Sequence, residues 1–215
     1  MTGRKLPPPE AVQNLAVSDP RLAEAMARVP PFPGFPDARR GGTHFHALAR
    51  AVLYQQLATK AAATIHGRVM ALTPGIRFPT PEEFLALPEQ VVRDAGVSRA
   101  KLAAIRDLAE RTVDGRLPLG RIARLPDDEV VERLVEVRGI GAWTARMFLL
   151  FRLGRLDVLA PDDLGIREGV RRLDGLEERP PAAMVEARGE VWRPLRSVAS
   201  WVLWRLLDEK TPGTG

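Results

Sequence analysis

Apolar residues recur every three or four positions along most of the chain, and this spacing predicts a protein made of helices. Between residues 43 and 57, for example, the apolar side chains at this period are Phe45, Leu48, Ala49, Val52 and Leu53. No segment alternates apolar and polar residues as a half-buried strand does, and no Asn-Gly hairpin turn occurs. We therefore expect an all-α fold of about ten short helices.

Capping residues, glycines and prolines set the expected helix boundaries. The candidate N-caps are Asp19, Thr43, Thr59, Thr80 and Ser98, and Gly96 and Gly115 are candidate stops. The predicted helices are 20–29, 43–57, 59–72, 98–115, 127–137, 142–153, 163–173, 181–190 and 194–209, with two shorter ones after Pro81 and Pro88. The longest connectors between them are residues 30–42 and 73–79.

Proline and glycine cluster at residues 30–42 and around residues 154–162, and these clusters suggest crossings between two helical lobes. Residues 41–158 are predicted to form a central lobe. Residues 1–40 and 159–215, the two ends of the chain, are predicted to form the second lobe together.

Composition narrows the possible functions. Hydrophobic residues make up 45% of the chain, but no apolar run approaches the length of a membrane span, and the first residues lack the apolar core of a signal peptide. We therefore expect a cytoplasmic protein without a membrane partner. The absence of cysteine excludes disulfides, thiolate zinc sites and iron–sulfur clusters.

The formal net charge is +5, and only four of the 32 basic residues are lysines. Arginine suits bidentate phosphate contacts, so this composition is compatible with nucleic-acid binding. A GC-rich genome together with solvated helix faces explains the same numbers equally well. Charge alone therefore leaves the partner open.

The most informative stretch is LVEVRGIGAWTARMFLLFRLG, residues 134–154. Gly139 and Gly141 bracket Ile140 between two predicted helices, which predicts a tight hairpin with Ile140 anchored in the core. Glycines leave backbone N–H groups accessible, and these groups lie at a helix N-terminus, where an anion such as phosphate is favoured.

This stretch resembles the helix-hairpin-helix element of base-excision DNA glycosylases. The resemblance continues in LAPDDLGIREGVRRL (159–173) and WRPLRSVASWVLW (192–204), and upstream in LARAVLYQQLATKAAATIHGRV (48–69). Over residues 43–207 the chain is similar to the 3-methyladenine DNA glycosylase II family. The resemblance implies two helical lobes flanking a DNA-binding cleft, with the helix-hairpin-helix at about 127–153. The N-terminal β-rich domain of longer members has no counterpart here, so a compact form is expected.

In this superfamily the catalytic aspartate follows the hairpin at the start of a helix, and the matching residue is Asp163. Asp after Pro is most often a helix cap, and we expect Asp162 to be the cap or a local hydrogen-bonding partner. Bifunctional members carry a nucleophilic lysine where this chain has Trp143, and no lysine lies between residues 102 and 209. The resemblance therefore implies a monofunctional enzyme without lyase activity.

The family lines its base pocket at positions that match Trp143 and Trp204. One aromatic residue expected in the second hairpin helix is replaced by Met147, and Tyr54 is a candidate for the missing aromatic face or else a core residue. An electron-rich wall attracts a cationic base. We expect Trp192 and Trp201 to be structural.

Further DNA contacts are expected from the hairpin (Gly139, Ile140, Gly141), from Thr144, and from Gln55 and Gln56, which match residues that fill the gap left by a flipped base. Arg193 and Arg196 either touch phosphate or pair with acidic neighbours. The resemblance also implies a monovalent cation, Na⁺ or K⁺, on the carbonyls of Val135, Val137 and Ile140. The three histidines show no metal-binding spacing, so no cofactor is expected to be required.

These observations predict an enzyme of base-excision repair that flips alkylated purines, 3-methyladenine above all, out of double-stranded DNA and leaves an abasic site. It is expected to act as a monomer in the nucleoid. The alternatives are a non-catalytic DNA-binding protein that uses the hairpin alone, and a glycosylase for mismatched, deaminated or oxidised bases. Asp163 in register with the hairpin argues against the first alternative.

Overall fold

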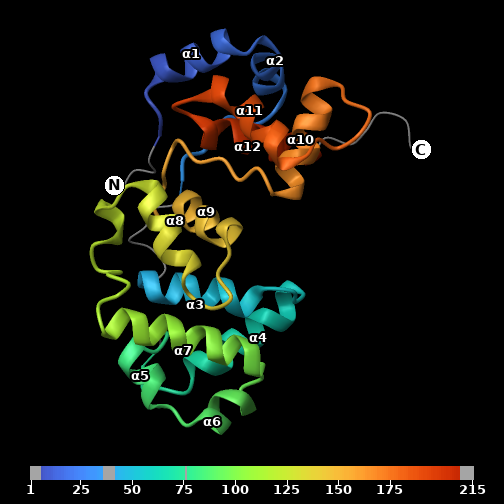
Figure 1. Ribbon diagram of the computed structural model, residues 1–215. Helices are drawn as coiled ribbons and strands as arrows, with labels where there is room; N and C mark the ends of the chain where they lie inside the picture. The colour runs from blue at the N-terminus through green and yellow to red at the C-terminus, as the bar shows by residue number, and fades with distance from the viewer. Residues whose placement is uncertain (1–5, 36–41, 76, 209–215) are drawn as a thin grey trace, which may run out of the picture. The chain divides into compact units, whose positions relative to one another are not determined.

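The computed structural model of the protein describes residues 6–35, 42–75 and 77–208 (Figure 1). Within these residues the chain forms twelve α-helices and two short 3₁₀ helices, with no β-strand and a single isolated β-bridge residue at Phe35. The all-α prediction is confirmed. No helix in the described ranges is long and apolar enough to cross a membrane.

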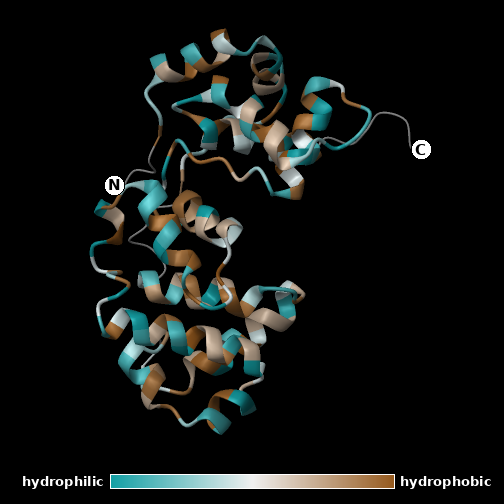
Figure 2. Ribbon diagram, viewed as in Figure 1, coloured by the Kyte–Doolittle hydropathy of each residue, from teal (hydrophilic) through white to brown (hydrophobic). Residues whose placement is uncertain are grey.

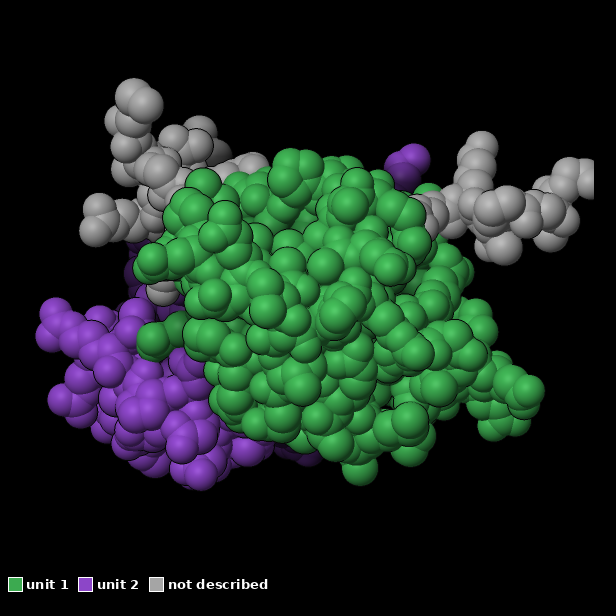
Figure 3. All heavy atoms as spheres, turned by 90° about the horizontal axis from the view of Figure 1, so that it is seen from above, with its two compact units in different colours: residues 1–37, 154–215 green, residues 38–153 purple. Residues whose placement is uncertain are grey.

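The chain divides into two compact units, which Figure 3 shows in different colours. The central unit is residues 38–153, and the terminal unit combines residues 1–37 with residues 154–215. In each unit the helices carry hydrophobic and hydrophilic residues on different sides (Figure 2), as expected for helices that bury one face.

The central unit contains α3 (His44–Tyr54), α4 (Thr59–Met70), α5 (Pro81–Ala86), α6 (Glu89–Asp94), α7 (Arg99–Val113), η1 (Ile122–Arg124), α8 (Asp127–Val135) and α9 (Ala142–Phe151). The long helix α7 packs against α3 and α5, and α8 packs against α9 (Figure 1). Fully buried leucine and isoleucine side chains on α7 form the centre of this core.

The terminal unit contains α1 (Pro9–Ser18), α2 (Pro20–Arg28), α10 (Leu164–Asp174), α11 (Ala182–Arg188), η2 (Gly189–Trp192) and α12 (Arg196–Asp208). Helix α12 packs against α10 and α2. Trp192 is completely buried, as predicted for a structural tryptophan, and its Nε1 donates to Asp19 Oδ2 at 2.7 Å. The sequence analysis missed α1, which begins directly after two prolines and has no side-chain cap.

The predicted N-caps are confirmed except at Thr59. Asp19, Thr43 and Ser98 each accept a hydrogen bond from the backbone N–H three residues later, and Thr80 forms a complete capping box with Glu83. Thr59 is instead the first residue of α4, where its hydroxyl makes no capping bond. The N-cap position there belongs to Ala58, so the local chain has no capping side chain.

Candidate active site and DNA interface

The residues between α8 and α9, 136–141, form a tight hairpin (Figure 1). Successive backbone bonds close it: Val137 N–H donates to the Leu134 carbonyl, and Ile140 N–H donates to the Val137 carbonyl, both at 3.1 Å. Ile140 is 3% exposed, so its side chain is buried as predicted, while Gly139 and Gly141 are exposed on either side of it.

The two hairpin glycines are required for different reasons. Gly139 has φ +76°, and a Cβ there would lie 3.2 Å from the Cβ of Ala104 on α7. Both the backbone and the packing therefore favour glycine at 139. Gly141 has an ordinary φ of −95°, and a Cβ there would meet nothing within 4 Å. The fold itself therefore tolerates a side chain at 141.

The hairpin leaves several backbone donors available at the start of α9. The Arg138 N–H is used, because it donates to Asp107 Oδ2 at 2.7 Å. Within the described residues, the N–H groups of Gly139, Gly141 and Ala142 make no hydrogen bond, and α9 has no capping side chain. Unpaired N–H groups at a helix N-terminus attract anions, so this end of α9 is suited to a phosphate.

Residues 55–57, which follow α3, form a turn that we call the glutamine turn. Its two glutamines have different surroundings. Gln55 is half-buried, and its Nε2 donates to the Gly139 carbonyl of the hairpin at 3.0 Å. Gln56 is exposed and has φ +55°, the only positive φ among the described non-glycine residues. The side chain of Gln55 is therefore engaged within the protein, whereas that of Gln56 faces solvent.

The predicted pocket residues of the central unit lie together around one cavity of about 790 Å³. Its lining includes Tyr54, Gln55, Gln56, Trp143, Thr144 and Met147. Trp143 is 46% exposed, so part of its side chain is accessible to solvent. Thr144 is 7% exposed, which fits a place in the cavity wall better than a phosphate contact.

The ring of Tyr54, a predicted pocket wall, already has a cation on one face. The Arg50 guanidinium lies 4.1 Å from the ring centroid. A cationic base would have to compete with Arg50 for that face. Trp143, the other predicted aromatic wall of the central unit, lines the same cavity.

In the terminal unit, Asp163 is the N-cap of α10. Its Oδ1 accepts hydrogen bonds from the Ile166 N–H and from Trp204 Nε1, each at 2.9 Å. Asp162 was predicted to be the cap or a local hydrogen-bonding partner, and the first alternative is wrong, since Asp163 itself makes the capping bond. Capping and a second donor together fix the orientation of the Asp163 carboxylate.

Trp204 reaches Asp163 because α10 and α12 approach closely at two glycines. A Cβ at Gly165 would lie 2.9 Å from Trp204 Cδ1, and one at Gly169 would lie 2.6 Å from Leu203 Cβ. Trp204 was predicted as a wall of the base pocket, and the sequence analysis missed its bond to the carboxylate. The spacing of Gly165 and Gly169, four residues apart on one helix face, was the available signal.

The other predicted residues of the terminal unit have structural partners. Arg193 and Arg196 both pair with Asp157, at 3.0 and 2.8 Å. This result agrees with the alternative that they bind acidic neighbours. Trp201 packs edge-on against Phe32 with ring centroids 6.0 Å apart, as expected for a structural tryptophan.

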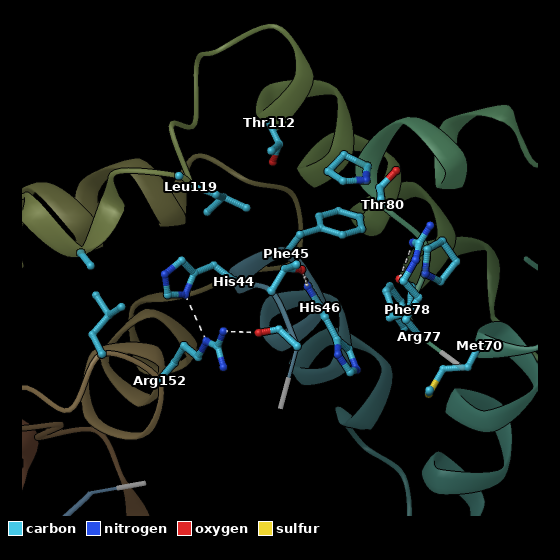
Figure 4. Close-up of a pocket in the computed structure, with 17 residues that line it drawn as sticks. His44, Phe45, His46, Met70, Arg77, Phe78, Thr80, Thr112, Leu119 and Arg152 are labelled. Carbon is cyan, nitrogen blue, oxygen red and sulfur yellow. Dashed lines mark hydrogen bonds between the residues drawn. The ribbon is translucent and has the colours of Figure 1, made fainter. Parts of the chain in front are cut away.

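All three histidines belong to the central unit, and His44 and His46 line a second cavity of about 890 Å³ (Figure 4). His44 Nδ1 accepts a hydrogen bond from Arg152 at 3.1 Å, and His46 Nε2 lies 2.8 Å from His66 Nε2. Burial, together with the neighbouring His66 and Arg50, lowers the pKa of His46 to about 4. The described part of the chain contains no group of three His, Cys, Asp or Glu side chains that could hold a metal ion.

Comparison with known protein families identifies the superfamily to which the chain belongs. Residues 49–194 match the HhH-GPD superfamily of base excision DNA repair proteins. The chain belongs to this superfamily. The match includes the glutamine turn, the hairpin and Asp163, so both regions described above lie inside the HhH-GPD segment.

Individual relatives place the chain near one branch of the superfamily. The DNA-3-methyladenine glycosylase 1 of Schizosaccharomyces pombe is 40% identical over 162 residues, which cover 75% of this chain and 71% of the relative. A solved structure of a 3-methyladenine DNA glycosylase from the same organism, in complex with abasic DNA, superposes with a TM-score of 0.75 at 34% identity, covering 93% of this chain and 97% of that one.

A DNA-3-methyladenine glycosidase from Bacillus halodurans gives a TM-score of 0.78 at 33% identity, with 90% of this chain and 87% of that chain covered. The resemblance of this HhH-GPD protein to the 3-methyladenine DNA glycosylases, predicted from its motifs, is confirmed.

Proposed function

We propose that this HhH-GPD protein is a monofunctional DNA glycosylase that excises alkylated purines from double-stranded DNA. The observation that carries the proposal is Asp163, a carboxylate oriented by two hydrogen bonds on Oδ1 in a chain whose relatives include DNA-3-methyladenine glycosylases. Those relatives act on the substrate class that we propose here.

In this proposal the Asp163 carboxylate stabilises the positive charge that develops on the sugar. Breaking an N-glycosidic bond passes through an oxocarbenium-like state, which a fixed negative group favours without having to reorganise. The same carboxylate orients water for attack on the sugar. An alkylated purine already carries positive charge and leaves readily, so no second carboxylate acting as an acid is needed.

DNA binding is assigned to the hairpin. The N–H groups of Gly139, Gly141 and Ala142 hold a backbone phosphate at the N-terminus of α9, where the helix dipole favours an anion. Such contacts position the duplex without reading its sequence. The target base has to leave the stack before reaction, and Gln56, exposed at the glutamine turn, is suited to occupy the gap.

Base recognition is assigned to Trp143, Met147 and Trp204. Trp143 offers a half-exposed aromatic face, on which a desolvated cationic base gains about 1–2 kcal/mol. Met147 adds a polarisable apolar surface beside it in the cavity lining. Trp204 is assigned to the wall and, through Nε1, to the orientation of Asp163.

Lyase activity is not part of the proposal, because Trp143 occupies the position of the lysine nucleophile in bifunctional relatives of this fold. We also propose that the enzyme acts as a monomer in the cytoplasm. A monovalent cation would bind the carbonyls of Val135, Val137 and Ile140 and add positive charge at the hairpin. The donors suit such an ion, since the Val135 and Ile140 carbonyls accept no hydrogen bond from the described residues.

Oligonucleotide duplexes that each carry one lesion test this function. Incubation with duplexes containing an alkylated, deaminated, oxidised or mismatched base, followed by alkaline cleavage, reports which base is removed. We expect abasic sites at alkylated purines, no strand cleavage before alkali, and no protein–DNA adduct trapped by borohydride. Removal of only deaminated, oxidised or mismatched bases, or a trapped adduct, contradicts the proposal. Binding without excision of any base supports a DNA-binding role alone.

A further inference from the structure

The glutamine turn has a conformation that needs external support. Helix α3 ends at Tyr54, and Gln56 then adopts φ +55°, a region that non-glycine residues enter at a cost. Gln56 and Leu57 are both exposed, so packing of their own side chains does not hold this backbone. The support has to come from contacts made by the neighbouring residues.

Lys101, on the first turn of α7, supplies such contacts. Its Nζ donates to the Leu53 carbonyl at 2.7 Å and to the Gln55 carbonyl at 2.8 Å. A cation at the C-terminal end of α3 is favourable, since the helix dipole is negative there. The Lys101 side chain is half-buried, so these charge-assisted hydrogen bonds are partly shielded from water. The same burial lowers the pKa of Lys101.

The same face of α7 also supports the hairpin. Ala104 lies against Gly139, where an added Cβ would be crowded at 3.2 Å, and Asp107 Oδ2 accepts the Arg138 N–H at 2.7 Å. Lys101, Ala104 and Asp107 are three residues apart and therefore follow one stripe of the helix. Gln55 completes the link, because its Nε2 donates to the Gly139 carbonyl at 3.0 Å.

From this geometry we infer that Lys101 is a positioning residue for base extrusion. It holds the glutamine turn on α7 at a fixed distance from the hairpin, so that Gln56 is presented to the duplex wherever the hairpin binds phosphate. Of the two glutamines, Gln55 connects the turn to the hairpin, and only Gln56 acts on the DNA. The inference rests on the proposed glycosylase function. It predicts that loss of Lys101 impairs extrusion of the base while phosphate binding is kept.

The test compares Lys101→Met with a matched control, Arg99→Met. Arg99 is exposed two residues earlier on α7, and its side chain makes no hydrogen bond with the described residues, so its replacement removes the same charge without touching the turn. Single-turnover excision of 7-methylguanine is measured opposite cytosine and opposite an abasic analogue. Without a pairing partner, extrusion costs less. Affinity for undamaged duplex and thermal unfolding are measured beside it.

Lys101→Met should slow excision opposite cytosine by about tenfold or more, and clearly less opposite the abasic analogue, with affinity for undamaged duplex within about twofold. Arg99→Met should match the parent. If Lys101→Met does not fold, Gln55→Met, which removes only the bond to Gly139, should show the same dependence on the opposite position. Parental excision, or an equal loss on both duplexes, overturns the inference. A parent that excises no base refutes the proposed function instead.

Discussion

The hairpin of the central unit and the Asp163 corner of the terminal unit are both built at the N-terminus of a helix, but the two helix ends are completed differently. At α9 no side chain caps the helix, and the N–H groups of Gly141 and Ala142 make no hydrogen bond within the described residues. At α10 the carboxylate of Asp163 caps the helix and receives Trp204 Nε1 as well. An uncapped end receives an external anion, whereas a capped end fixes the protein's own anion.

This difference predicts different responses to substitution. Backbone N–H groups are present whatever the side chain, so the hairpin should tolerate changes that preserve its shape. The Asp163 corner depends on one carboxylate and on the donors that orient it. Substitutions at Asp163 or its donors should therefore lower the excision rate strongly and change DNA affinity little. Substitutions at the hairpin should lower DNA affinity, and more so when the new side chain is larger.

The largest effect is expected for Asp163→Asn. The amide oxygen can still accept the Ile166 N–H, so the helix remains capped, but the negative charge that stabilises the oxocarbenium-like sugar is gone. Single-turnover excision should fall by about 10³-fold or more. Affinity for damaged duplex should stay the same or rise, because a charge that repels phosphates is removed. Asp162→Asn, the matched control at an exposed neighbour, should excise close to the parental rate. Near-normal turnover in both variants rules out the catalytic assignment.

Trp204→Phe separates the two roles assigned to this tryptophan. Phenylalanine keeps an aromatic ring but cannot donate to Asp163 Oδ1, so one of the two bonds that orient the carboxylate is lost. We expect excision to slow by about tenfold, the size of one hydrogen bond to a charged group. The loss should be equal for a cationic base, 7-methylguanine, and a neutral one, 1,N6-ethenoadenine. A loss confined to the cationic base would identify Trp204 as a pocket wall only.

Much of this arrangement was predictable from sequence because it depends on local rules. Helix periodicity, the caps at Asp19, Thr43, Thr80 and Ser98, and the buried Ile140 between exposed glycines are all set by residues within a few positions of each other. The cap at Asp163 was assigned to Asp162, because two adjacent aspartates offer the same chemistry and only the backbone path decides which one points back at Ile166.

The interactions that the sequence analysis missed join residues far apart in the sequence. Trp204 reaches Asp163 across 41 residues, and Lys101 reaches the glutamine turn across 46. Such partners depend on how helices pack, which the spacing of apolar residues does not specify. Likewise, Gln55 and Gln56 are identical side chains in adjacent positions, and only the approach of the hairpin to one of them distinguishes their surroundings.

A smaller effect is expected at the hairpin glycines, and it tests whether the α9 terminus really binds phosphate. Gly141→Ala should fold normally, because φ there is −95° and the added Cβ meets nothing within 4 Å. Its affinity for damaged and undamaged duplex should fall alike by up to about tenfold, because the methyl group crowds the phosphate. Gly141→Val should bind more weakly still.

Gly139→Ala is the comparison for that experiment, since it should also unfold at a lower temperature: its φ is +76° and Ala104 is 3.2 Å away. Thermal unfolding measured beside filter binding or anisotropy distinguishes the two cases. If a folded Gly141→Val protein binds like the parent, the hairpin is a structural turn and its anchoring role has to be abandoned.

The smallest predicted effect is a loss of stability at mildly acidic pH, which we expect in the central unit before the terminal unit. All three histidines of the chain lie in the central unit, and burial lowers the pKa of each below the value of 6.5 expected in the unfolded chain, that of His46 to about 4. Because the unfolded state binds these protons first, their contribution to stability is complete above pH 6.5 and is lost as the pH falls from 6.5 towards 4. The lowered pKa values of Asp19 and Glu168 in the terminal unit belong to a more acidic range.

Between pH 6.5 and 5 we therefore expect the central unit to lose on the order of 1 kcal/mol through His46, after allowance for its partial exposure. Hydrogen-exchange protection factors, which correct for the slower intrinsic exchange at lower pH, should fall in α3 and α7 before they fall in α10 and α12. His46→Phe retains a ring beside His66 and Phe78, whose ring centroids lie 5.0 and 4.8 Å from that of His46, but the new ring cannot be protonated. The variant should show a flatter dependence of unfolding temperature on pH. An unchanged slope in His46→Phe would mean that His46 is not the source of the acid sensitivity. An equal loss of protection in α10 and α12 would mean that acid destabilises the terminal unit as much as the central unit.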